Sequence, residues 1–181
     1  MTLADLTGML PLLARLYGAD LPPDAGESGG PAAPSGRKQG RTSDSKVRKA
    51  IELFAEDHAV AFFAEQGWQV KRVGQYKLGY DLVCANLDGA ILHVEVKGTR
   101  TLGEKVTLTA NEVEHVRRAA DCGAEHILYV VSEITVTGED ETLTCSGGTA
   151  TRLRPWAISD RDLIATEYTY TVPPSATSPG S

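Results

Sequence analysis

The stretch that decides the fold is Gly79-Tyr80-Asp81-Leu82-Val83, followed after a short turn by His93-Val94-Glu95-Val96-Lys97-Gly98. Side chains along a β-strand point alternately to opposite faces, so His93, Glu95 and Lys97 share one face of the second run. The opposite face is aliphatic and suited to burial. Three ionisable groups in a row tolerate burial only when they are paired or bound to a metal.

The segment between the two runs, Asn86-Leu87-Asp88-Gly89, is a hairpin signal, because its Asp-Gly pair tolerates positive φ. A hairpin here brings Asp81 back beside the strand that carries Glu95. Two carboxylates then converge on one point, which suits a hard cation such as Mg²⁺ with oxygen ligands. Two acids and a lysine on adjacent strands can bind this cation and hydrolyse a phosphodiester. The alternative is a solvated sheet edge with a cross-strand ion pair, which would stabilise the sheet only slightly.

The pattern resembles the PD-(D/E)XK nuclease superfamily. It resembles more closely the restriction-endonuclease-like domain named after the C-terminal part of the plant NO VEIN protein. The resemblance covers roughly residues 46–135 and rests on five blocks in the same order and spacing. These blocks are Gly67-Trp68-Gln69-Val70, Gly79-Tyr80-Asp81, Glu95-Val96-Lys97-Gly98-Thr99, Leu108-Thr109-Ala110-Asn111-Glu112 and Leu128-Tyr129-Val130-Val131.

The resemblance implies a role for four residues of the blocks that contain Asp81 and Glu95. Asp81 and Glu95 would be ligands of Mg²⁺ or Mn²⁺, and the Val96 carbonyl would be a third ligand. Lys97 would orient or polarise the attacking water, or stabilise the pentavalent phosphate. These roles agree with the general chemistry of metal-assisted hydrolysis, in which a cation offsets negative charge and lowers the pKa of its bound water.

Members of the superfamily often add a glutamate from the helix that precedes the first strand. Glu52 and Glu56 are both candidates, because they lie one turn apart on one helical face. The resemblance favours Glu52, which falls where relatives tend to carry an acid. The alternative for either residue is an ordinary solvated helix surface.

The periodicity of the apolar residues predicts an α/β fold. It indicates a helix over 45–66, strands over 68–73 and 106–108, a helix from Thr109 to about Asp121, and a strand over 127–131. With the strands around Asp81 and Glu95, the order becomes helix, three-strand β-meander, helix and strand. This is the restriction-endonuclease-like core, followed by a C-terminal β extension that includes a hairpin over 143–153 around Gly147-Gly148 and a last strand over 168–172.

The sequence predicts four segments along the chain. Residues 1–20 form an amphipathic helix, 21–44 a flexible linker, 45–172 the domain and 173–181 a disordered tail. Within the domain, the core covers 46–135 and the extension 136–172. The first helix is too short to cross a bilayer and lacks the features of a signal peptide, so we expect it to contact the domain or a partner, with no membrane role.

Two pairs of residues are candidates for nucleic-acid contacts. Asn111 and His115 are spaced i, i+4 on the second helix, so they can meet on one face near the acidic site. Arg152 and Arg154 stand close to Trp156, a combination that can hold a phosphate and stack a base. The alternatives are a solvated helix surface for the first pair and a core or lid position for the tryptophan.

Composition limits the functional classes. The net charge of −6 argues mildly against a dedicated, tight nucleic-acid binder, although a metal site would consume part of that charge. Three cysteines without paired spacing suggest a reducing cytoplasm and argue against a disulfide framework or a zinc site.

Two hypotheses follow from these observations. The first is a metal-dependent nuclease acting on nucleic acid, with DNA favoured, in restriction, bacterial defence or DNA repair. The second is a catalytically silent module of the same fold that binds nucleic acid or a protein partner. A dimer would suit cleavage of both strands, and a protein partner would bind through the N-terminal helix. An intact set of Asp81, Glu95 and Lys97 favours the nuclease, because buried charges are costly unless compensated.

Overall fold

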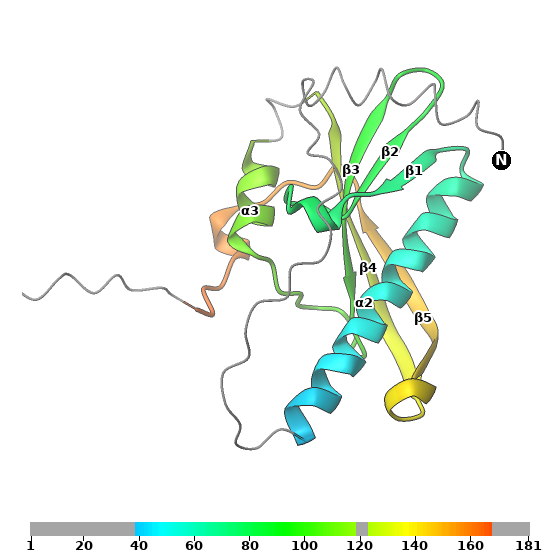
Figure 1. The fold of residues 1–181 in the computed structure, drawn as a ribbon. Helices are drawn as coiled ribbons and strands as arrows, with labels where there is room; N and C mark the ends of the chain where they lie inside the picture. The colour runs from blue at the N-terminus through cyan, green and yellow to red at the C-terminus, as the bar shows by residue number, and fades with distance from the viewer. Residues whose placement is uncertain (1–38, 119–122, 168–181) are drawn as a thin grey trace, which may run out of the picture.

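A computed structural model of the chain describes residues 39–118 and 123–167, with side chains from residue 44 onward (Figure 1). The predicted N-terminal helix, the linker up to residue 38, the end of the second helix beyond residue 118, the last strand and the tail lie outside the described residues. No helix in the described part of the chain is long and apolar enough to cross a membrane.

A five-stranded mixed sheet forms the centre of the α/β fold, as the periodicity predicts. The strand order follows the sequence order, β1-β2-β3-β4-β5. Neighbouring strands are antiparallel except β3 and β4, which are parallel and connected through helix α3. The strands are β1 (Gln69–Arg72), β2 (Leu82–Ala85), β3 (Ile91–Gly98), β4 (Glu125–Thr137) and β5 (Thr144–Leu153). The predicted order of helix, three-strand meander, helix and strand is therefore confirmed.

Helix α2 (Gln39–Glu65) covers one face of the sheet. Its buried residues recur every fourth position, at Ile51, Ala55, Ala59 and Phe63, and they pack on Leu92, Val94 and Val96 of β3 and their neighbours. The helix begins six residues before the predicted start at residue 45, so the predicted linker boundary at residue 44 is wrong. Gly40 lies within its first turn, and no glycine or proline interrupts residues 41–66.

Helix α3 (Ala110–Arg117) lies on the other side of the sheet (Figure 1). Thr109 is its N-cap, as predicted, and forms a capping box with Glu112. Its buried residue Val116 packs with Leu128 and Val130 of β4 and with Trp156, which places that tryptophan in a core.

Two predicted strand features are absent from the described structure. Residues 106–108 form no strand, and the partly buried side chains of Val106 and Leu108 pack against Val116 and its neighbours. The predicted hairpin over 143–153 is instead the single strand β5. The chain turns earlier, at the short 3-10 helix Asp140–Thr142, and β5 then pairs with β4 along its length. Two further single turns are Gly74–Tyr76 and Asp160–Asp162.

Candidate functional site

The acidic site lies beside β3, at the point where the chain enters β2. Strand β2 starts at Leu82, which pairs with Val94, and the backbone N–H of Asp81 donates to the Val94 carbonyl at 2.9 Å. The N–H of Val96 donates to Asp81 Oδ2 at 2.9 Å. In a strand the N–H and C=O of one residue face the same neighbour, so the Val96 carbonyl points to the side on which Asp81 lies. The structure thus brings Asp81 and Val96 together as the sequence predicts.

Lys97 connects β3 to helix α3. Its Nζ lies 2.6 Å from Glu95 Oε1 and 2.8 Å from Glu112 Oε2. Glu112 is itself fixed by the capping box, in which its carboxylate accepts a hydrogen bond from the backbone N–H of Thr109 at 3.0 Å. The lysine is therefore held between two carboxylates that come from different elements.

Glu95 is almost completely buried, at 2% exposure, and its Oε2 has no hydrogen-bond partner within the described residues. Burial raises the pKa of Glu95 to about 8 against the opposing effect of Lys97, and the neighbouring Asp81 raises it further. Burial likewise raises the pKa of Asp81 to about 6, although the Val96 N–H opposes this shift. The two acids thus form a site in which two negative charges are costly and a cation would be favourable.

The positive charge of Lys97 is stabilised although the side chain is largely buried. Burial is the largest single effect on this ammonium and opposes its charge, but Glu95 and Glu112 together raise its pKa. Burial also opposes the charge of Glu112, yet Lys97 and Thr109 lower the pKa of this carboxyl overall. Lys97 and Glu112 therefore form a charged pair beside Glu95.

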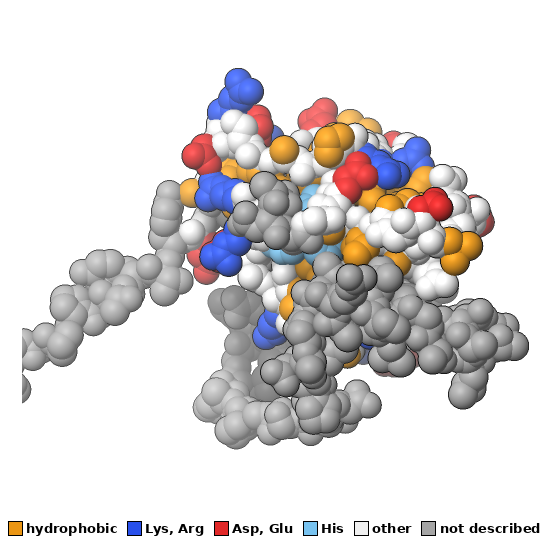
Figure 2. All heavy atoms as spheres, turned by 90° about the horizontal axis from the view of Figure 1, so that it is seen from above, with side chains coloured by type: hydrophobic (Ala, Val, Ile, Leu, Met, Phe, Trp, Pro, Cys, Tyr) orange, Lys and Arg blue, Asp and Glu red, His pale blue; other side chains and the backbone are white. Residues whose placement is uncertain are grey.

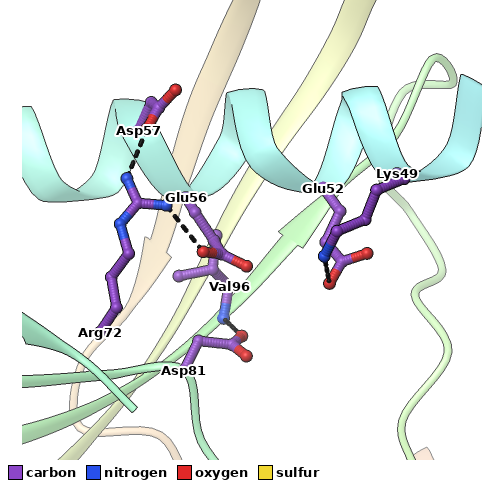
Figure 3. A network of polar contacts seen from close by, with 7 residues as sticks. All are labelled: Lys49, Glu52, Glu56, Asp57, Arg72, Asp81 and Val96. Atoms are coloured by element: carbon purple, nitrogen blue, oxygen red, sulfur yellow. Dashed lines mark hydrogen bonds and ion pairs between the residues drawn. The ribbon is translucent and has the colours of Figure 1, made fainter. Parts of the chain in front are cut away.

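The two candidate glutamates of helix α2 occupy different surroundings. The Glu56 side chain is 15% exposed, accepts a hydrogen bond at 2.8 Å from Arg72 of β1, and contributes to the raised pKa of Asp81. The Glu52 side chain is 54% exposed and pairs with Lys49 at 3.1 Å. Figure 3 shows the Glu56 carboxylate directed toward Val96 and Asp81, while Glu52 lies further along the helix beside Lys49. Of the two glutamates, Glu56 is the one that lies near Asp81.

The donor set fits a hard divalent cation. It combines the buried, unpartnered Oε2 of Glu95, the carboxylate of Asp81 and the edge that carries the Val96 carbonyl. Oxygen donors of this kind are those that Mg²⁺ and Mn²⁺ prefer. A bound cation would displace the protons that the raised pKa values of both acids otherwise retain.

The four candidate nucleic-acid contacts are not brought together. Asn111 donates a hydrogen bond to the backbone carbonyl of Lys77, and His115 bonds to His93 at 3.1 Å, so both hold α3 against the β1–β3 region. Arg152 and Arg154 lie on the side of the sheet that carries α2. The Arg152 guanidinium lies 4.3 Å from the Phe62 ring centroid, and Arg154 forms two hydrogen bonds with Glu125, at 3.0 and 2.8 Å.

Sequence reasoning assigned no role to Glu112, although it is the second partner of Lys97. One signal was available, because Thr109 followed three residues later by a glutamate is the pattern of a capping box. That pattern fixes where the helix begins and how Glu112 is oriented at its end. The capping pattern does not predict how the helix packs on β3, and this packing creates the contact between Glu112 and Lys97.

These features define an α/β domain with a buried carboxylate–lysine site on the central strand of its sheet, beside the start of β2. The model of the family described as Protein NO VEIN, C-terminal, matches residues 51–145. The match covers more than half of the 181-residue chain, so the chain belongs to this family. It includes Asp81, Glu95, Val96 and Lys97 and both candidate glutamates, Glu52 and Glu56. No curated protein and no solved structure matched the chain.

Proposed function

We propose that the chain is a metal-dependent nuclease of the PD-(D/E)XK type that hydrolyses phosphodiester bonds. The observation that carries the proposal is the Glu95 carboxylate, which is 2% exposed, has one unpartnered oxygen and lies next to Asp81 and Lys97. Ionising this buried acid beside Asp81 is costly, and Lys97 offsets the cost only in part, because the pKa of Glu95 stays raised at about 8. A cation at the same place offsets that cost.

Each residue contributes a separate function to the proposed reaction. Asp81, Glu95 and the Val96 carbonyl hold Mg²⁺ or Mn²⁺, which when bound lowers the pKa of its water and offsets negative charge on the phosphate. Lys97, positioned by Glu95 and Glu112, places its ammonium beside the scissile phosphate and orients the attacking water. Glu56 takes the place of Glu52 as the auxiliary acid, because it is the glutamate that lies near Asp81.

The substrate and setting follow from the same proposal. The favoured substrate is DNA, in restriction, defence or repair within the cytoplasm. The two cysteines within the described residues, Cys84 and Cys145, are free thiols, which is consistent with a reducing compartment. A homodimer would place two such sites on a duplex, and the N-terminal segment remains the proposed contact for a protein partner.

The test is cleavage of plasmid and single-stranded DNA in Mg²⁺ or Mn²⁺ by the natural chain and by Asp81→Asn and Lys97→Met. We expect cleavage that requires the metal and falls by about 100-fold or more in both variants. Absence of cleavage by a folded chain that also fails to bind Mg²⁺ or Mn²⁺ would favour the silent binding module.

Two further variants form a matched pair one helical turn apart. Glu56→Gln should reduce cleavage by roughly ten-fold, because it removes an acid close to Asp81. Glu52→Gln should leave cleavage within about two-fold, since its carboxylate pairs with Lys49 at the surface. The reverse ranking would assign the auxiliary role to Glu52.

A further inference from the structure

Three of the four histidines of the chain meet on the α3 side of the sheet. His93 of β3 and His126 of β4 are register partners in the parallel pair, and His115 comes from the last turn of α3. In the described part of the chain these three are the one group of three or more potential metal ligands whose donor atoms all lie within 4.8 Å of one another. The register of β3 with β4 and the packing of α3 therefore bring the three histidines together.

The ring geometry shows how closely the histidines approach. His93 Nδ1 lies 3.1 Å from His115 Nε2, and the rings of His115 and His126 are stacked with centroids 4.6 Å apart. The Tyr80 ring also packs against the cluster and stacks on the His93 ring, with centroids 4.0 Å apart. His93 and His126 are buried, whereas His115 is partly exposed. Figure 2 shows histidine atoms visible near the middle of the face seen from above, next to hydrophobic and other side chains.

The arrangement matches the requirements of a transition metal. With Zn–N bonds of about 2.0–2.1 Å, tetrahedral geometry separates two ligating nitrogens by roughly 3.3 Å. The His93–His115 pair is close to this separation, whereas the His115 and His126 rings lie parallel, so one of them must turn out of the stack for all three lone pairs to point at one ion. The neutral imidazole is the form that ligates metals. A neutral ring carries its proton on either nitrogen, so a change of tautomer frees the ligating lone pair.

We propose that His93, His115 and His126 form a Zn²⁺ site that is separate from the carboxylate site. Three imidazoles suit a borderline-soft cation, whereas the oxygen donors of Asp81 and Glu95 suit Mg²⁺. The two sites share β3, where His93 and Glu95 lie two residues, or about 6.6 Å, apart on one face. Three protein ligands also leave a fourth position for water or another ligand.

The proposal is tested by metal binding, without reference to cleavage. The full chain is stripped with a chelator and titrated with Zn²⁺ in competition with a chromophoric chelator, and with Co²⁺ to record its visible absorption. The variants are His115→Gln and His126→Gln, with His58→Gln as the matched control. His58 is the fourth histidine and bonds to the Tyr129 hydroxyl on the α2 side of the sheet.

We expect one Zn²⁺ per chain, a tetrahedral Co²⁺ spectrum, and affinity at least about 100-fold weaker in His115→Gln and His126→Gln, because each loses a ligand. His58→Gln and the double variant Asp81→Asn/Glu95→Gln should retain Zn²⁺ binding. Unchanged affinity in His115→Gln, loss of binding in the carboxylate double variant, or no Zn²⁺ on the folded natural chain would each overturn the site.

A second measurement needs no substitution. Long-range ¹H–¹⁵N NMR of the natural chain resolves the ring nitrogens of all four histidines before and after addition of Zn²⁺. The expected result is a metal-induced shift of one ligating nitrogen in each of three rings, with the His58 ring unchanged. Shifts confined to His58 would contradict the proposal even if a variant failed to fold.

Discussion

Glu95 carries a proton that the folded chain holds more tightly than the unfolded chain does. Burial raises its pKa from 4.5 to about 8. The stability associated with this group is therefore complete below about pH 4.5 and is lost as the pH rises through about 8. Each unit of difference between the two pKa values corresponds to about 1.4 kcal/mol. Without a cation, ionisation of Glu95 works against folding.

The substitution Glu95→Gln should consequently stabilise the metal-free chain at high pH. The amide keeps the volume of the side chain but cannot ionise, so its advantage over the natural residue should grow between pH 5 and pH 9. Urea unfolding in a chelator at several pH values measures this difference. The exposed Glu104→Gln serves as the control. A Glu95→Gln effect independent of pH would contradict the raised pKa.

Single residues also show how far the sequence alone could predict the site. Glu95 and Lys97 follow from alternation within one strand, which needs no knowledge of tertiary structure. The choice between Glu52 and Glu56 depends on how α2 is rotated over the sheet, and both lie on the same helical face. The meeting of His115 with His126 requires the packing of α3 on β4. Such contacts between distant segments leave no local signal in the sequence.

At the scale of elements, α3 is short and depends on its N-terminal cap. The Thr109 hydroxyl accepts from the Glu112 N–H, and the Glu112 carboxylate also contacts Lys97. Thr109→Ala should lower the free energy of unfolding by about 1 kcal/mol, because one helical N–H loses its acceptor. Urea unfolding measures the change, with the exposed Thr107→Ala, outside the helix, as control. Equal losses in both variants would exclude a capping contribution.

The contact between α2 and β3 depends on Gly98. A Cβ at this position would lie 2.8 Å from the Ile51 carbonyl oxygen and 2.9 Å from the Ala55 Cβ. Gly98→Ala should therefore destabilise the chain by about 3 kcal/mol, because the helix must move away from the sheet. Gly89→Ala is the control, since a Cβ there meets nothing within 4 Å and only its positive φ of 83° is unfavourable, at about 1 kcal/mol. Thermal or urea unfolding that ranked the two variants the other way would contradict this packing.

The elements around β5 show why local turn signals can mislead. Gly147-Gly148 predicts a hairpin, yet both glycines lie within one strand. A Cβ on Gly148 would come within 2.8 Å of Val131 Cγ1, so the glycine permits close approach of β5 to β4. Residues suited to turns are also suited to tight packing between strands. The sequence pattern alone does not distinguish these two uses.

At the scale of the whole molecule, both candidate metal sites are built on the parallel β3–β4 pair and the helix that connects these two strands. Lys97, Glu95 and His93 come from β3, while α3 supplies Glu112 and His115. The predicted order of elements around this crossover is confirmed, because hydrophobic periodicity extends over whole strands and helices. The position of each polar side chain depends on packing that this periodicity does not describe.

Cation binding at the carboxylate site should therefore stabilise the whole fold. A ligand that binds only the folded state adds about 1.4 kcal/mol for each tenfold increase in its free concentration above Kd. For a chain of this size, the corresponding rise in Tm is about 3–5 °C. Thermal unfolding over a series of Mg²⁺ concentrations tests this, with Glu52→Gln as a control that should keep the shift. Asp81→Asn should abolish it, since it removes one of the two proposed carboxylate ligands, the other being Glu95. A Tm that rises equally in Asp81→Asn would place the stabilising Mg²⁺ elsewhere on the molecule.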